Sequence, residues 1–194
     1  MRSFILFLML FMQSNFAFSA ENIMSDTHTH VKFHTNLGDF IVELDAEKAP
    51  NTVKNFLTYV NEGFYNGTIF HRVIPGFMAQ GGGFDEDFKE KDNNENIENE
   101  ADNGLKNERG TLAMARTNDP HSATSQFFIN YKNNSFLNHS AKNSSGWGYA
   151  VFAKVIEGMD IVDEMENQKT GSHNGHQDVP KTNIVIETAE AFTK

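Results

Sequence analysis

Hydrophobic and polar positions alternate with a period of two in the first part of the chain that resembles a folded protein. Residues 31–35 alternate in this way, residues 40–44 do so again, and Asn-Leu-Gly at 36–38 separates the two runs. Successive side chains of a strand point to opposite faces of a sheet, so this alternation is typical of half-buried strands. The pattern predicts a β-hairpin over residues 31–44.

A helical spacing replaces the strand spacing in the segment from Ala49 to Gly63. Pro50 suits the first turn of a helix, and Gly63 suits its end. The apolar residues between them recur at i, i+3, i+4 and i+7, namely Val53, Phe56, Leu57 and Val60. A shorter pattern of this kind follows Gly158 and contains Met159, Ile161, Val162 and Met165. The sequence therefore predicts two amphipathic helices, each of which needs a partner surface such as a sheet.

The remaining apolar runs are short and strand-like, with clusters of Gly, Asn, Asp and Ser between them. These runs are residues 68–73, 77–80, 111–115, 126–129, 150–155 and 183–187. Many short strands with only two helices favour an antiparallel β-sandwich or barrel over an alternating α/β fold. Residues 84–109, rich in Asn, Asp and Glu, predict a long surface loop, and residues 171–180 predict another loop.

Composition narrows the class of protein. A chain of 194 residues with 39% hydrophobic residues and 18 phenylalanines can close one domain around a large aromatic core. The absence of cysteine excludes thiol nucleophiles, disulfides and thiolate metal sites. A formal charge of −10 argues against nonspecific nucleic-acid binding, which requires Lys and Arg to neutralise phosphates, so no nucleic-acid partner is expected.

The first 20 residues have the layout of a secretory signal peptide. Arg2 precedes the apolar run Phe4–Met12, and the small residues Ala17, Ser19 and Ala20 follow it. This run is shorter than the roughly 20 apolar residues that a membrane-spanning helix needs. Cleavage after Ser19 or Ala20 is expected, with an uncleaved anchor as the main alternative.

The expected organisation is a signal peptide over residues 1–20, a polar lead-in over residues 21–30 and one folded domain over residues 31–190. Export to a bacterial periplasm follows from the signal peptide, with no membrane association after its cleavage. A monomer is expected.

Three histidines, His28, His30 and His34, lie at the start of the predicted hairpin. On a strand they would share one face, which is a possible arrangement for metal ligands. No fourth ligand is suggested by the spacing, so an exposed terminal strand is the preferred interpretation. No metal and no cofactor are expected.

The stretch FHRVIPGFMAQGGG, residues 70–83, contains a cation and large apolar side chains but no obvious nucleophile and no paired acid and base. Two further segments complete a pattern: GTLAMART precedes SATSQFFIN, and NSFLN precedes GWGYAVFAKVIEGMDIVDEM. In this order the motifs resemble the cyclophilins, the peptidyl-prolyl cis–trans isomerase family, over nearly everything from Val31 to Glu187. NEADNGL at residues 99–105 and the link MARTNDPHSATSQFF resemble the bacterial branch.

The resemblance implies an all-β dominated fold, a closed eight-stranded antiparallel β-barrel capped by two α-helices. It implies a catalytic role for Arg72 and a hydrogen bond from Gln80 to the substrate backbone. The substrate-binding residues that it implies are Phe77, Met78, Ala115, Gln126, Phe128, Phe136, Leu137 and Tyr149. Phe136 stands where the cyclosporin-binding vertebrate proteins have tryptophan, and Tyr149 stands where they have histidine. Tight cyclosporin binding is therefore not expected, whereas catalysis is.

Prolyl isomerisation breaks no covalent bond, which explains a site without a nucleophile. The barrier of roughly 18–20 kcal/mol is the loss of amide resonance as the bond twists. The proline nitrogen then regains a lone pair, and a donor such as Arg72 aimed at it helps only in the transition state. The expected substrates are Xaa-Pro bonds of unfolded or flexible polypeptides.

Two other functions remain open from the sequence alone. A peptide-binding chaperone could use the same pocket with incidental isomerase activity, and a metal-dependent enzyme could use the histidines. His71 is expected to be structural, because the reaction transfers no proton. Phe127 is expected to face the core, opposite Phe128. Gly81–Gly83 predict a turn or bulge rather than a phosphate loop, because no Gly-Lys-Ser/Thr follows them.

Overall fold

The computed structural model describes residues 29–193, so the predicted signal peptide and nearly all of the polar lead-in lie outside the described residues. The helices are α1 (Pro50–Asn61), α2 (Met159–Glu166) and the short 3-10 helix η1 (Ser135–Leu137). The strands are β1 (Thr29–Thr35), β2 (Gly38–Leu44), β3 (Thr68–Ile69), β4 (Arg72–Ile74), β5 (Met78–Gly81), β6 (Thr111–Met114), β7 (Phe127–Asn130), β8 (Val151–Glu157), β9 (Thr170–His173), β10 (His176–Pro180) and β11 (Val185–Thr193).

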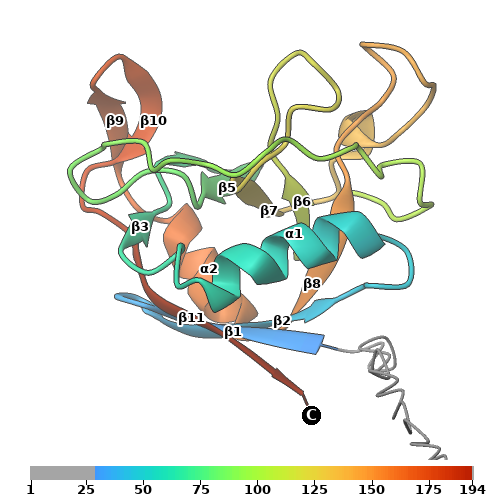
Figure 1. Ribbon diagram of the computed structural model, residues 1–194. Coiled ribbons are helices and arrows are strands. Elements are labelled where there is room, and N and C mark those ends of the chain that lie inside the picture. Colours follow the sequence, from blue (N-terminus) through green and yellow to red (C-terminus); the bar gives the residue numbers. More distant parts are fainter. Residues whose placement is uncertain (1–28, 194) are drawn as a thin grey trace, which may run out of the picture.

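Nine of these strands form one strongly curled antiparallel sheet in the order β3-β11-β1-β2-β8-β6-β7-β5-β4 (Figure 1). The expectation of a closed eight-stranded barrel is therefore wrong. The predicted strand over residues 68–73 is broken at Phe70 and His71, and its two halves, β3 and β4, become the two edges of the sheet. β3 also bonds to the segment that follows β5, since the Ile69 N–H donates to the Phe84 carbonyl at 2.9 Å.

The predicted first hairpin is confirmed as β1 and β2. Phe33 faces Phe40 across it, with ring centroids 4.7 Å apart. β1 is not an exposed terminal strand, however, because β11 continues to Thr193 and covers its other edge. His30 is consequently 5% exposed. Within residues 29–193 no group of three or more His, Cys, Asp or Glu side chains could hold a metal ion, and His28 lies outside this range.

Both predicted helices are confirmed. Val53, Phe56 and Val60 of α1 are buried, as their spacing predicts, and α1 packs on β11. Val162 and Met165 of α2 are buried against the sheet, where α2 contacts β2, β4 and β5. Neither helix, nor any other in the described chain, is long and apolar enough to cross a membrane.

The inner face of the curled sheet encloses an aromatic core. Phe127 is fully buried there, as predicted, and its ring meets those of Phe56 and Tyr65 edge-on at centroid distances of 5.7 and 5.5 Å. The next residue, Phe128, points the other way and joins a second apolar cluster on the outer face. This second cluster consists of Met78, Ala113, Phe128, Leu137 and Val151, with Phe77, Ala115 and Tyr149 packed against it.

The interpretation of residues 171–180 as a loop is wrong, because most of this segment belongs to the β9–β10 hairpin. Asn174 and Gly175, both with positive φ, form its turn. Val179 anchors the hairpin in a small cluster with Ile69 and Phe88. Residues 84–109 contain no named helix or strand, as predicted, but this segment is packed, since Phe88, Ala101 and Asn107 are buried.

Candidate active site

Four neighbouring strands place a row of side chains on the outer face of the sheet. Arg72 of β4 stands opposite Gln80 of β5, and Gln80 stands opposite Phe128 of β7. Phe128 in turn stands opposite Ala113 of β6. Directly opposed residues share a face, with their Cβ atoms about 4.5–5.5 Å apart. Backbone pairing therefore holds a cation, an amide and an aromatic ring side by side.

A hollow of about 320 Å³, here called the outer pocket, opens on this row. It is lined by Arg72, Phe77, Met78, Gln80, Ala115, Arg116, Phe128, Phe136, Leu137 and Tyr149. Of the residues predicted to form the site, only Gln126 is not part of this lining. Its side chain is hydrogen-bonded to that of Gln80, which does line the pocket. The sheet thus brings together residues that lie far apart in the sequence.

The floor of the outer pocket is apolar and almost completely buried. Met78, Phe128 and Leu137 are 3%, 4% and 9% exposed. The Tyr149 ring meets Phe128 edge-on at 5.6 Å between centroids. Phe136, by contrast, is 71% exposed and stacks on Phe77 at the mouth. The pocket is a small hollow with an apolar floor and an exposed aromatic ring at its mouth.

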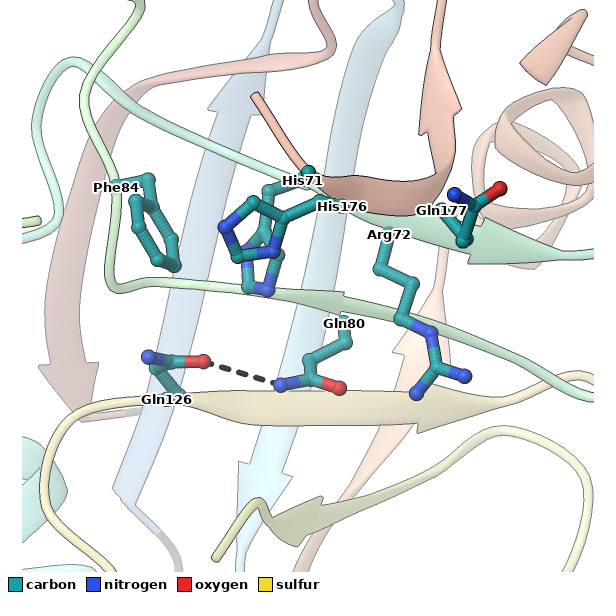
Figure 2. A pocket seen from close by; sticks show the side chains of 8 residues that line it. His71, Arg72, Gln80, Phe84, Gln126, His176 and Gln177 are labelled. Atoms are coloured by element: carbon teal, nitrogen blue, oxygen red, sulfur yellow. Dashed lines mark hydrogen bonds between the residues drawn. The ribbon is translucent and has the colours of Figure 1, made fainter. Parts of the chain in front are cut away.

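Polar groups line one side of this hollow. The Gln80 Nε2 donates to the Gln126 Oε1 at 3.0 Å, as the dashed line in Figure 2 shows. This bond leaves the Gln80 Oε1 available as an acceptor. The Arg72 side chain is 44% exposed, and its Nε lies 3.7 Å from the Asp178 Oδ2. A charged donor and an oriented amide therefore stand beside an apolar floor.

A second hollow of about 450 Å³, the side hollow, shares Arg72 and Gln80 with the outer pocket and lies between Gln126 and the β9–β10 hairpin (Figure 2). His71 lines it but is only 4% exposed. Burial, followed by electrostatic interactions with His176 and Arg72, lowers the pKa of His71 to about 4. His71 is therefore neutral at pH 7, which fits its predicted structural role.

The family model of the cyclophilin-type peptidyl-prolyl cis–trans isomerases matches residues 30–191. The chain belongs to the cyclophilin family. It is 61% identical over 158 residues to peptidyl-prolyl cis-trans isomerase B of Escherichia coli (strain K12), which covers 81% of this chain and 96% of that protein. It is 59% identical over 160 residues to peptidyl-prolyl cis-trans isomerase cyp18 of Streptomyces antibioticus, covering 82% and 96%. This cyclophilin is thus a peptidyl-prolyl cis–trans isomerase.

Solved structures support the same family assignment. A crystal structure of a Cryptosporidium parvum cyclophilin-type peptidyl-prolyl cis-trans isomerase matches with a TM-score of 0.69 and 31% identity, covering 86% of this chain and 99% of that one. The all-β dominated fold with two helices is therefore that of the cyclophilins.

Sequence reasoning missed Arg116 of this cyclophilin as a pocket residue. Its Cζ lies 4.6 Å from the centroid of the Tyr149 ring, and its Nε donates to the Gly148 carbonyl at 3.0 Å. The extra residue in the link MARTNDPHSATSQFF, near the start of which Arg116 lies, obscured this part of the motif, although an arginine directly after Ala115 was a usable signal. The outer pocket therefore has a second cation on the side of Tyr149.

A buried chain of asparagines, also missed from the sequence, supports the walls of the cyclophilin pocket. The Asn134 Nδ2 donates to the Phe77 carbonyl at 3.0 Å and to the Asn130 Oδ1 at 2.8 Å. The Asn130 Nδ2 donates to the Asn107 Oδ1 at 3.2 Å, and the Asn107 Nδ2 donates to the Leu137 carbonyl at 3.3 Å. Side-chain amides therefore join the backbone segments that carry Phe77 and Leu137.

Proposed function

We propose that this cyclophilin rotates Xaa-Pro bonds by seating the proline ring in the outer pocket while Arg72 donates a hydrogen bond to the twisting amide. The observation that carries the proposal is the strand register, which holds Arg72 and Gln80 beside the buried ring of Phe128. The substrates are proline-containing polypeptides that can present an extended segment.

The apolar floor supplies binding energy. A proline ring laid on Met78, Phe128 and Leu137 would lose contact with water, and burying an apolar side chain of this kind contributes roughly 1.5–3 kcal/mol. A dry pocket also favours the twisted amide, which is less polar than the planar one. The floor therefore binds the proline and lowers part of the barrier.

Arg72 supplies the interaction that is specific to the transition state. Its guanidinium stays charged at every physiological pH and carries donors on all three nitrogens. As the proline nitrogen becomes pyramidal, it gains a lone pair that can accept a hydrogen bond from Arg72, whereas the planar amide nitrogen has none to offer. Only such differential binding raises the rate of the bound substrate.

Gln80 holds the rest of the peptide still. Its Nε2 is already committed to Gln126, so its Oε1 is oriented to accept from a backbone N–H of the substrate. Holding the peptide on one side of the Xaa-Pro bond while the other side rotates keeps the reacting amide correctly oriented. Moving the reaction from tens of seconds to milliseconds requires about 5–6 kcal/mol in total, which a pocket and two polar contacts can supply.

The test is isomerisation of a short Xaa-Pro peptide, measured by NMR exchange with wild type and Arg72→Ala side by side. Loss of the transition-state donor should lower kcat/KM by a factor of about 100–1,000. Arg109→Ala is the matched control, because Arg109 is similarly exposed and also forms an ion pair, with Asp163, away from the outer pocket. Full activity in Arg72→Ala would overturn the mechanism. Peptide binding without any acceleration by folded wild type would instead favour a chaperone role.

We further propose export to a bacterial periplasm, on the pattern of Arg2, the apolar run Phe4–Met12 and the small residues after it. The test is N-terminal sequencing of the protein recovered from periplasmic and cytoplasmic fractions. A mature chain that begins near Ala20 or Glu21 in the periplasm supports the proposal, and an intact chain in the cytoplasm contradicts it.

A further inference from the structure

We infer that Asp178 is a positioning residue for the isomerase reaction. Its carboxylate restrains the Nε end of Arg72 and so directs the terminal nitrogens of the guanidinium toward the outer pocket. This inference rests on the catalytic role proposed for Arg72, and the experiment below separates the two.

The backbone of β10 is irregular where it packs against β4. β10 pairs with β9 at His176 and again from Val179, and the register shifts between them, so Gln177 and Asp178 form a bulge. Asp178 has a φ of 62°, in the left-handed region that L-residues other than Gly, Asn and Asp rarely adopt. Bulges re-aim side chains, and non-glycine residues in such conformations concentrate at functional sites.

The re-aimed side chain reaches Arg72. The Asp178 Oδ2 lies 3.7 Å from the Arg72 Nε, and the two side chains are 41% and 44% exposed. Among residues 29–193, Asp178 is the only acidic residue that forms an ion pair with Arg72. The carboxylate approaches Nε, and Figure 2 shows the two terminal nitrogens of Arg72 pointing away from the β10 backbone.

Arg72 needs such a restraint because of its place in the fold. It stands on β4, an edge strand of three residues, and its long side chain has many rotamers when half exposed. A donor accelerates the twisting of an amide only when it is held within a small distance and angle of the proline nitrogen. A fixed negative charge at Nε selects the rotamers that leave both terminal NH₂ groups free for substrate.

The experiment compares kcat and KM for peptide isomerisation in wild type, Asp178→Asn and Asp178→Gly. Both replacements remove the charge and tolerate positive φ, so the backbone strain is not increased. We expect kcat to fall by about threefold to fivefold, the effect of losing an exposed ion pair, with KM unchanged within about twofold. Asp163→Asn is the matched control, because it breaks the equally exposed pair with Arg109 outside the site, and it should keep wild-type kcat.

A double-mutant cycle distinguishes an effect of Asp178 that acts through Arg72 from a general effect on the structure. In the Arg72→Ala background, Asp178→Asn should have no further effect on kcat, because the restraint acts only through Arg72. The NMR signal of the Arg72 Nε–Hε group should also shift in Asp178→Asn and stay in place in Asp163→Asn. An unchanged or increased kcat in Asp178→Asn, or equal losses in both backgrounds, would overturn the role of Asp178 even if Arg72→Ala shows its expected loss of activity. Full activity in Arg72→Ala would overturn the proposed function itself.

Discussion

His71 is the neighbour of Arg72 in sequence but has the opposite environment. His71 precedes β4 and does not line the outer pocket, and its ring packs against Phe84 at 4.7 Å and His176 at 6.5 Å between centroids. Burial, His176 and Arg72 all disfavour its charged form, which is why its pKa falls to about 4. The fold therefore favours the neutral form of this side chain.

Folding stability should consequently depend on the protonation of His71. Its pKa is about 6.5 in the unfolded chain and about 4 in the folded one, so the unfolded state binds more protons between these values. The contribution is fully present above pH 6.5 and is lost as the pH falls toward 4, by about 3 kcal/mol in total. Urea denaturation across this range measures it, and His71→Gln, which cannot be protonated, should flatten the curve.

Two aspartates titrate below the pH range of 6.5 to 4 in which His71 is expected to act, so their effect on stability can be told apart from that of His71. Lys32 lowers the pKa of Asp39, and Lys142 lowers the pKa of Asp102, in each case through a side-chain hydrogen bond. Their contributions are present above the ordinary value of 3.8 and are lost only below it. Equal pH dependence of wild type and His71→Gln between pH 6.5 and 4 would contradict the role given to His71.

At the scale of elements, the walls of the outer pocket depend on polar groups behind them rather than on apolar packing alone. Asn134 joins the turn before β5 to β7, and Asn107 joins the long irregular segment to η1. Each amide adds a second hydrogen bond to a carbonyl that already accepts from a backbone N–H, Phe77 from Tyr131 and Leu137 from Tyr149. Buried polar groups of this kind are costly to leave unpaired.

Replacing Asn134 by Ala should lower the free energy of unfolding by about 1–3 kcal/mol, because it leaves the Asn130 Oδ1 unpaired and removes one of the two hydrogen bonds to the Phe77 carbonyl. KM for the peptide should rise as well, since Phe77 loses its support. Asn118→Ala is the control: Asn118 is exposed, and the change should cost less than about 0.5 kcal/mol. Denaturant titration and isomerase kinetics on both variants provide the measurement. Equal stability of the two variants would contradict the asparagine chain as a support.

At the scale of the whole molecule, one curled sheet serves two purposes with its two faces. The inner face of β7 closes the aromatic core through Phe127, and the outer face builds the floor of the outer pocket through Phe128. Neighbouring residues therefore have different surroundings: Phe127 packs in the core, and Phe128 lines the outer pocket.

This division predicts opposite outcomes for the same substitution at adjacent positions. Phe127→Ala should lower the free energy of unfolding by about 3–5 kcal/mol by leaving a cavity in the core, while the folded fraction keeps its affinity for peptide. Phe128→Ala should cost less stability, because the outer pocket already opens to solvent, but should raise KM strongly. Thermal unfolding and peptide kinetics on both variants distinguish the cases. Similar effects of the two changes on stability and on KM would contradict the division.

Much of the fold was predictable from local pattern. Alternation predicted the first hairpin, and the i, i+3, i+4 spacing predicted α1 and α2, because one buried face per element is a local property. The β9–β10 hairpin escaped prediction, since its residues are mostly polar and only Val179 and Pro180 at its end are buried. The central place of β1 was missed for another reason: its second neighbour, β11, lies at the other end of the chain.

The positions of the outer pocket were predictable because they lie within the three cyclophilin motifs. The supporting residues were not, because each acts across a long sequence separation. Asp178 reaches Arg72 from β10, and Asn107 reaches Leu137 from the irregular segment. Such contacts depend on how the strands are ordered in the sheet, which local spacing does not encode.

The order of the strands also makes some parts of the site more rigid than others. β7, which carries Phe128, is paired on both sides, whereas β4, which carries Arg72, is an edge strand paired only with β5. Elements with fewer partners open and shift at a lower free energy than those in the middle of a sheet. The outer pocket therefore has a stiff floor and a compliant rim. Under the proposed mechanism, the proline ring rests on the stiffer strand, whereas Arg72 stands on the strand that shifts more readily and depends on a contact such as that with Asp178 to hold its position.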